Sequence, residues 1–199
     1  VLTLESRRNR CAVAGEDLGA VPDVVRETMD RHRLQRLYVG QLQPPSSPPP
    51  EETVASLNTH DLRPFAGFLE GLDIGDRLEY RLITQDEEAE ARAGRSRSLE
   101  VIAAALVESG FLQDEKADPT ELLDAWLRWL GAGPARMVLV NAEDLWLESR
   151  AHNVPGTPDS RPNWVGRAAH SVPDMEQSDR INRQLKRLGA ARRLAEDAR

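Results

Sequence analysis

The sequence is poor in cysteine and histidine and has no long apolar run. Cys11 is the single cysteine, which excludes an internal disulfide and a cysteine-based zinc cluster and suits a reducing compartment, so we expect a cytoplasmic protein. The four histidines are scattered without the spacing of metal ligands, and we expect neither a metal site nor a cofactor. No stretch approaches the ~18 apolar residues of a membrane span, so we expect no membrane segment.

The chain also lacks a basic stripe. Its formal net charge is -7, and its acidic and basic residues are interleaved through most of the chain. Because nucleic-acid binding requires clustered cations that neutralise phosphates, nucleic acid is not an expected partner. No glycine-rich phosphate loop follows a predicted strand, which counts against a nucleotide-binding sheet.

The first residues, Val1 to Ser6, contain neither an initiator methionine nor the charged, apolar and small-residue regions of a signal peptide. They read like the middle of a helix, and Arg7, Arg8 and Arg10 are cations that suit the end of that helix. We therefore expect the chain to begin partway through a larger protein.

Four short apolar runs have the length and composition of strands, and helical or long-loop segments separate them. The predicted strands are 11–15, 37–42, 53–57 and 136–140. The predicted helices are about 2–10, 23–31, 99–109, 118–130 and 176–199. This alternation favours an α/β fold with a parallel sheet, with functional groups at the carboxyl ends of the strands.

Other segments receive no regular structure. The proline-rich loop 44–50 is either a stiff surface connection or a wall of an active site. Pro64 is expected to keep the segment after the third strand from continuing as a strand or helix. Residues 65–77, which hold three glycines, are predicted to be irregular, and 86–95 to be a charged, solvated stretch.

Carboxylates stand where two of the predicted strands end. Glu16 and Asp17 follow the first strand, and His60 and Asp61 follow the third. Two carboxylates on neighbouring strand ends suit glycoside chemistry, because one protonates the leaving oxygen and the other attacks or stabilises the oxocarbenium-like centre. The spacing does not prove that they meet. In the alternative interpretation the aspartates cap helices or turns and Glu16 is a surface acid.

Five motifs, taken in order, resemble the 4-alpha-glucanotransferases, the amylomaltases or disproportionating enzymes of glycoside hydrolase family 77. They are Gly15-Glu16-Asp17-Leu18-Gly19 with Val21-Pro22 and Val25-Arg26, Asn58-Thr59-His60-Asp61 before Gly67-Phe68, Glu143-Asp144-Leu145, Asn153-Val154-Pro155-Gly156-Thr157, and Pro162-Asn163-Trp164. The resemblance implies a (β/α)8 TIM barrel, of which this chain would be the C-terminal half, about strands five to eight with their helices. It also implies a maltodextrin or another α-1,4-glucan as substrate, whose segments are transferred between chains with retention.

The resemblance also implies roles for individual residues. Glu16 matches the acid/base, Asp61 the carboxylate that stabilises the transition state, and His60 the histidine that hydrogen-bonds the sugar beside the scissile bond. Asn153 is placed near the sugar, the alternative being a rigid turn, and Asp17 is placed with the substrate-binding residues. Glu16 must stay protonated until it donates, so we expect burial or a nearby carboxylate to raise its pKa. Asp61 should stay ionised.

On this resemblance, residues 1–172 form the C-terminal half of the catalytic barrel and 173–199 a charged helical tail. The family's aspartate nucleophile would lie upstream of residue 1, so no covalent glycosyl-enzyme could form and we expect the 199 residues alone to be inactive. We also expect them to fold poorly, because half a barrel leaves sheet edges exposed. The alternative function is a non-catalytic α-glucan-binding or scaffolding module of the same fold.

Three predictions concern the last motifs. Glu143 and Asp144 either line the bottom of the cleft or cap the following turn. Trp146 is expected to pack in the core rather than to stack on a glucose ring, because aromatic residues at such positions are more often core. Asn163 and Trp164 are expected to anchor the C-terminal segment against the barrel.

Overall fold

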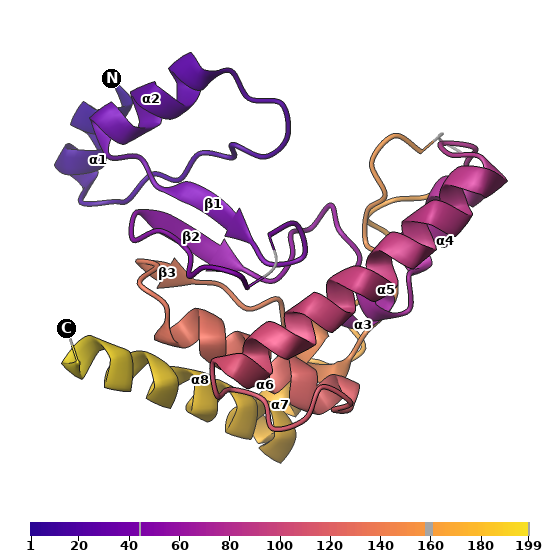
Figure 1. The fold of residues 1–199 in the computed structure, drawn as a ribbon. Coiled ribbons are helices and arrows are strands. Elements are labelled where there is room, and N and C mark those ends of the chain that lie inside the picture. The colour runs from indigo at the N-terminus through magenta and orange to yellow at the C-terminus, as the bar shows by residue number, and fades with distance from the viewer. Residues whose placement is uncertain (44, 158–160, 199) are drawn as a thin grey trace.

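The computed structural model describes residues 1–43, 45–157 and 161–198, and its centre is a small parallel sheet (Figure 1). The strands β1 (Arg36–Val39), β2 (Thr53–Ser56) and β3 (Met137–Val138) are neighbours in chain order. All adjacent pairs are parallel. They are the second, third and fourth predicted strands, each shortened, so the predicted α/β fold with a parallel sheet is confirmed.

The first predicted strand, 11–15, is wrong as a strand. Ala14 forms a single parallel bridge with Gln35. Gln35 donates its backbone N–H to Val13 O at 2.9 Å, and Gly15 donates to Gln35 O at 2.9 Å. Alanine and glycine have low strand propensity, and this segment pairs along only one edge, so the pairing stops after one bridge. The segment still lies parallel to the chain that leads into β1.

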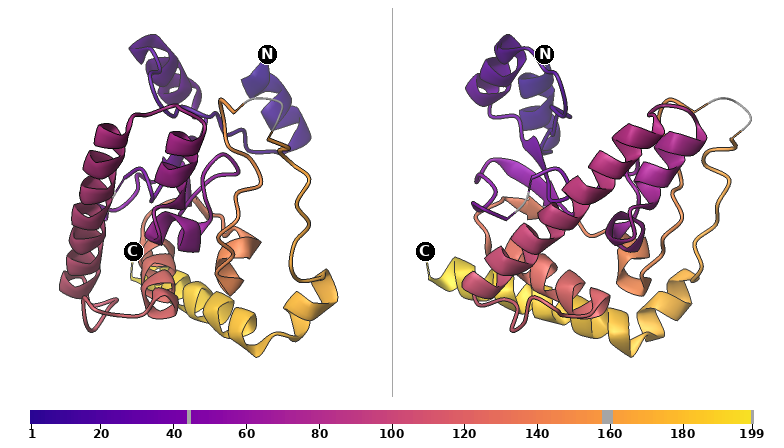
Figure 2. Two further views of the ribbon diagram at one scale, coloured as in Figure 1. Left: turned by 90° about the vertical axis from the view of Figure 1, so that its right-hand side faces the viewer. Right: turned by 45° about the vertical axis from the view of Figure 1, so that its right-hand side comes forward.

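Helices surround the sheet and account for most of the remaining structure. They are α1 (Leu2–Asn9), α2 (Asp23–His32), α3 (Phe65–Leu69), α4 (Leu72–Glu79), α5 (Gln85–Glu108), α6 (Pro119–Ala132), the 3-10 helix η1 (Ala142–Trp146), α7 (Val172–Gln177) and α8 (Asp179–Asp197). Both views of Figure 2 place α1 and α2 at one end of the molecule and α8 at the other. None of the helices in the described ranges combines the length and apolar character needed to cross a bilayer.

Two segments predicted to be irregular or merely solvated are helical. Residues 65–77 fall in α3 and α4, which Gly71 separates with a positive φ of 67°. Residues 57–63 form neither strand nor helix, as predicted from Pro64. Pro64 itself caps the start of α3, where a missing N–H costs nothing because no first-turn N–H has a helical partner. The charged stretch 86–95 is the first half of α5, which begins at a capping box on Thr84.

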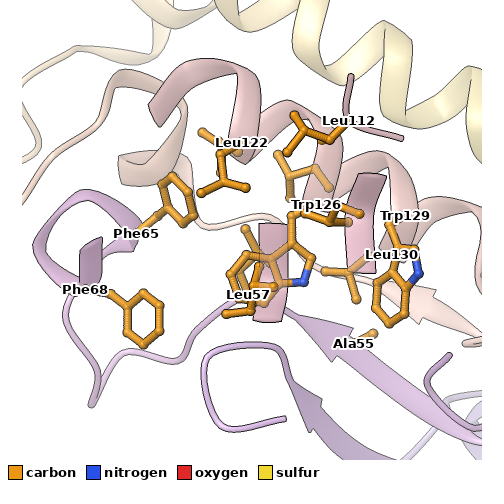
Figure 3. Close-up of a cluster of buried hydrophobic side chains, with 14 of the residues drawn as sticks. Ala55, Leu57, Phe65, Phe68, Leu112, Leu122, Trp126, Trp129 and Leu130 are labelled. Atoms are coloured by element: carbon orange, nitrogen blue, oxygen red, sulfur yellow. The ribbon is translucent and has the colours of Figure 1, made fainter. Parts of the chain in front are cut away.

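The core lies between the sheet and α6. Trp126 of α6 is fully buried, and Figure 3 shows its indole among Leu57, Phe65 and Leu130. The rings of Phe65 and Trp126 meet edge to face, with centroids 6.3 Å apart. A capping box on Asp118 fixes the start of α6 and confirms the predicted helix there. The contact between Phe65 and Trp126 fixes the position of α3 relative to the sheet. Because α3 begins just after the loop that carries Asp61, the same contact helps to position that loop.

The C-terminal helix α8 docks along α6. Ile181 of α8 is buried in the common core, and Leu188 lies so close to Gly131 that a Cβ on that glycine would be 2.5 Å from Leu188 Cδ1. Arg192 donates to the backbone oxygens of Ala135 and Arg136 at 2.9 Å each. The described part of the tail is therefore an ordered layer of this core. Pro44 of the predicted loop and Arg199 of the predicted tail lie outside the described residues.

Candidate functional site

The carboxyl ends of the parallel strands meet at one edge of the sheet, as they do in all parallel α/β sheets. The loop after β2 carries Asn58 to Asp61, and η1 follows β3 with Glu143 and Asp144. The segment that bridges to Gln35 runs in the same direction and ends at Glu16. The topology thus directs the acidic motifs after β2 and β3 to one edge of the sheet. The segment of Glu16 pairs only through Ala14, opposite Gln35, and its Asp17 bonds to Arg36 and Leu37 at the start of β1.

Asp61 is held by a residue that is distant in sequence. Asn153 donates its amide Nδ2 to Asp61 Oδ1 at 2.6 Å, across 92 residues of sequence. His60 Nε2 lies 3.5 Å from the same oxygen. The side chains of Asp61 and His60 are 39% and 62% exposed, so both remain open to a ligand. The structure therefore brings together three of the five predicted site residues.

A pocket of about 350 Å³ opens beside Asp61 and Asn153. Arg63 forms part of its wall by pairing with both oxygens of Asp76, at 2.7 and 2.5 Å, and by donating to Ser149 O at 2.8 Å. Its lining combines charged, amide and apolar groups: Gln41, Leu42, Asp61, Leu62, Arg63, Phe68, Asp73, Asp76, Arg77, Leu82, Arg95, Asn153, Val154 and Pro155. Its volume falls within the range of ligand sites, and its mixed lining suits a polyhydroxylated molecule that also has apolar ring faces.

A buried carboxylate, Asp144, joins η1 to the loop after β2. Asp144 accepts hydrogen bonds from Asn58 Nδ2 at 3.0 and 2.9 Å and from the backbone N–H of Phe65 at 2.7 Å. Burial raises the pKa of Asp144 to about 6, although these hydrogen bonds favour the ionised form. These bonds are made to the loop after β2 and to the start of α3, so they differ from the predicted cap of the turn that follows Asp144.

Glu143 binds the chain that leads to Asn153. His152 Nε2 lies 3.1 Å from Glu143 Oε1, and His152 O accepts the backbone N–H of Trp164 at 2.8 Å. Asn163 accepts the N–H of Val154 at 3.2 Å, which is a bond within its own loop and not the predicted anchor against the barrel. The prediction that Trp164 anchors the C-terminal segment is wrong, because its side chain is exposed and lies beside His60, with ring centroids 5.6 Å apart.

Glu16 and Asp17 differ sharply. Glu16 is exposed, so burial, one of the two influences that we expected at a proton donor, is not found. Asp17 is buried, with its Oδ2 accepting from Arg36 Nε at 2.6 Å and its Oδ1 accepting the N–H of Leu37 at 3.2 Å. Because both oxygens of Asp17 are occupied by β1, it is not available to bind sugar as predicted. Its contacts fix the chain beside Glu16 instead.

The described residues contain no cluster of three or more histidine, cysteine, aspartate or glutamate side chains placed to hold a metal ion. Trp146 packs against the core and meets His170 edge to face at 5.0 Å, as the predicted core position requires. Sequence reasoning missed Arg63, Asp76 and His152 altogether. Their partners are 9 to 86 residues away and no motif marks them, so no signal in a single sequence could have identified them.

Known proteins resemble this chain over most of its length. It is 33% identical over 176 residues to 4-alpha-glucanotransferases of Mycobacterium bovis and Mycobacterium tuberculosis, covering 82% of this chain and 24% of theirs. A 4-alpha-glucanotransferase of Haemophilus influenzae is 25% identical over 186 residues, covering 86% of this chain and 26% of its own. The chain therefore spans about a quarter of the length of the curated relatives that it matches.

Solved structures share the fold. The crystal structure of amylomaltase from Corynebacterium glutamicum superposes with a TM-score of 0.80 at 24% identity, over 96% of this chain and 30% of that one. Amylomaltase from Streptococcus agalactiae, in complex with acarbose, gives a TM-score of 0.56 at 16% identity, over 91% of this chain and 31% of that one. Residues 1–171 match the sequence model of the 4-alpha-glucanotransferases. The chain belongs to the 4-alpha-glucanotransferase family, glycoside hydrolase family 77.

Proposed function

We propose that this chain is the C-terminal part of a 4-alpha-glucanotransferase that transfers α-1,4-glucan segments between maltodextrins with retention. The relatives that carry this name are about four times as long as the matched region, which supports a longer enzyme. The observation that carries the proposal is the cluster of Asp61, His60 and Asn153 at the carboxyl edge of a parallel sheet, beside a pocket of about 350 Å³.

In the proposed reaction, Glu16 donates a proton to the leaving glycosidic oxygen and later accepts one from the 4-hydroxyl of the acceptor sugar. Asp61 stays ionised and stabilises the positive charge that develops on the ring. His60 and Asn153 hydrogen-bond the sugar and hold it beside Asp61. An aspartate from another part of the full-length protein attacks the anomeric carbon and forms the covalent intermediate that retention requires.

We further propose that the segment ending at Glu16 and the strands β1, β2 and β3 correspond to strands five to eight of a (β/α)8 barrel. Their parallel order in the chain and the single bridge from Ala14 support this assignment. Residues 1–172 would form the barrel half, and the family match over 1–171 supports that boundary. The docked helices after it would be an outer layer. A cytoplasmic location remains a prediction from the low cysteine content.

Disproportionation of maltotriose by the full-length protein tests the function. Wild type is expected to produce glucose and longer maltodextrins. Glu16→Gln is expected to lose about 10²- to 10⁴-fold in rate, the usual contribution of a positioned general acid/base. Asp23→Asn is the matched control, because Asp23 is an exposed carboxylate on the neighbouring helix α2. It should leave the rate unchanged.

The outcomes separate the two candidate functions. If wild type binds maltodextrins in a titration but produces neither glucose nor maltodextrins longer than the substrate, the chain belongs to a non-catalytic glucan-binding protein. If wild type is active and Glu16→Gln matches it, the transferase stands and the acid/base assignment is wrong.

A further inference from the structure

We propose that the two adjacent carboxylates of η1, Glu143 and Asp144, are positioning residues that fix Asp61 from two sides. The inference rests on the proposed function, because it concerns how the Asp61 carboxylate is held for the reaction. Neither residue touches Asp61 in the structure; each acts through the hydrogen bonds of one of the two chain segments that meet there.

Asp144 holds the segment that contains Asp61. It binds Asn58, three residues before Asp61, and the N–H of Phe65, four residues after it. The loop is therefore tied down at both ends by one buried side chain. Losing these bonds would be costly, because a buried donor that has lost its partner cannot form a hydrogen bond with water instead. The backbone path around Asp61 is thus fixed from η1, which follows β3, whereas Asp61 itself lies in the loop after β2.

Glu143 holds the segment that touches Asp61. His152 pairs with Glu143 at 3.1 Å and directly precedes Asn153, whose amide binds Asp61 Oδ1 at 2.6 Å. This loop crosses back to the site from 92 residues away, so its position depends on such bonds. Because Glu143 and Asp144 are consecutive residues of the short helix η1, the two anchors are joined directly, and one element sets the geometry of Asp61 relative to Asn153.

Charge is not needed for this role, and that makes the proposal testable. In Glu143→Gln the new amide keeps an oxygen that can accept from His152, whereas Glu143→Ala removes the acceptor. In Asp144→Asn the amide oxygen can still accept from Phe65, and its NH₂ can donate to Asn58 Oδ1, which has no partner among the described residues. Asp144→Ala loses the hydrogen bonds to both Asn58 and Phe65. Positioning therefore predicts that the amide variants rescue the alanine variants.

The experiment measures kcat and KM for maltotriose disproportionation by the full-length protein. Glu143→Ala and Asp144→Ala are each expected to lower kcat by about tenfold or more, because small misplacements of a catalytic group are costly. Glu143→Gln and Asp144→Asn should stay within about threefold of wild type. Asp124→Asn is the matched control: it removes a buried, ion-paired carboxylate of α6 and should lower the melting temperature without changing kcat.

A double-mutant cycle separates positioning from general loosening of the fold. If Glu143 acts through Asn153, the combination of Glu143→Ala and Asn153→Ala should be no slower than the slower single variant, because both remove the same contact to Asp61. Multiplicative losses would overturn the proposal, as would alanine variants that keep the wild-type kcat. If Asp144→Ala fails to fold, the half-buried Glu143 pair decides the question. An inactive wild type would instead overturn the proposed function itself.

Discussion

The two sides of the candidate site are built very differently. Around Asp61, hydrogen bonds between side chains join the loop after β2, η1 and the neighbouring residues His152 and Asn153, and one of the carboxylates involved is buried. Around Glu16, one parallel bridge and the buried Asp17 are the main anchors, and Glu16 itself is exposed. A charge that must face a developing cation gains from a fixed position. The comparison teaches that the structure fixes Asp61, the proposed stabilising carboxylate, more firmly than Glu16, the proposed proton donor.

The largest expected effect comes from removing the charge of Asp61 while keeping the shape of its side chain. We call the surroundings of Asp61 the braced side of the site and those of Glu16 the open side. Asp61→Asn retains an oxygen that can accept from Asn153, so the network should survive. We expect kcat to fall by about 10²- to 10³-fold, the usual cost of losing one preorganised electrostatic contact. Steady-state kinetics of the full-length protein on maltotriose measures this. An unchanged melting temperature would show that only the charge was lost, and an unchanged kcat would refute the role of Asp61.

The buried carboxylate of Asp144 should make the free energy of unfolding depend on pH. The pKa of Asp144 is about 6 when folded, above the value of an exposed aspartate. Between these two pKa values the folded state binds more protons than the unfolded state, so stability falls as pH rises. A shift of about two units corresponds to about 3 kcal/mol, present at about pH 4 and lost above about pH 6.

Denaturant unfolding at several pH values checks this prediction, with Asp144→Asn as the comparison. The variant has no titrating group at this position, so its stability should change less between pH 4 and 7. Asp174→Asn serves as a control, because burial is not the main influence on that exposed carboxylate and hydrogen bonds from Ser171 hold its pKa low. Parallel pH profiles for wild type and Asp144→Asn would contradict the prediction.

A smaller effect is expected from crowding the braced side. A Cβ at Gly67 would lie 2.6 Å from the backbone oxygen of Ser149, which also accepts a hydrogen bond from Arg63. Gly67→Ala must therefore push α3 away from this backbone and should cost about 1 to 3 kcal/mol in unfolding free energy, as overpacking typically does. Thermal unfolding measures it. Gly75→Ala is the control, because its Cβ would meet only a flexible arginine side chain at 3.7 Å.

The smallest effect is expected on the open side. Asp17→Asn keeps an oxygen that can accept the N–H of Leu37 but loses the charge-assisted bond to Arg36. Because Arg36 is partly exposed, water can replace that contact, and we expect a loss of about 1 kcal/mol. Chemical denaturation measures the loss. A cost larger than that of Gly67→Ala would show that the Glu16 side is as firmly built as the Asp61 side.

Much of the fold was predictable wherever its signal is local. The starts of α6 and α2 follow from Asp118 with Pro119 and from Pro22 with Asp23. The three strands were located because apolar, β-branched runs mark them. The failures at 11–15 and 65–77 have physical causes: a lone edge pairing stopped the first from becoming a strand, and packing of Phe65 and Phe68 in the core made helices of a glycine-containing segment.

The candidate site, too, has a part that local sequence motifs predict and a part that depends on contacts between distant residues. The sequence by itself determined which residues are proposed to carry the chemistry, because Glu16, His60, Asp61 and Asn153 lie in ordered motifs that resemble one family. Only the tertiary structure decided that Asp17 is bound by β1, and that Asp144 and Glu143 hold the two segments meeting at Asp61. The physical reason is that these contacts join residues as many as 92 positions apart. Such hydrogen bonds form only after the strands and helices have packed, and they leave no periodic trace in the chain.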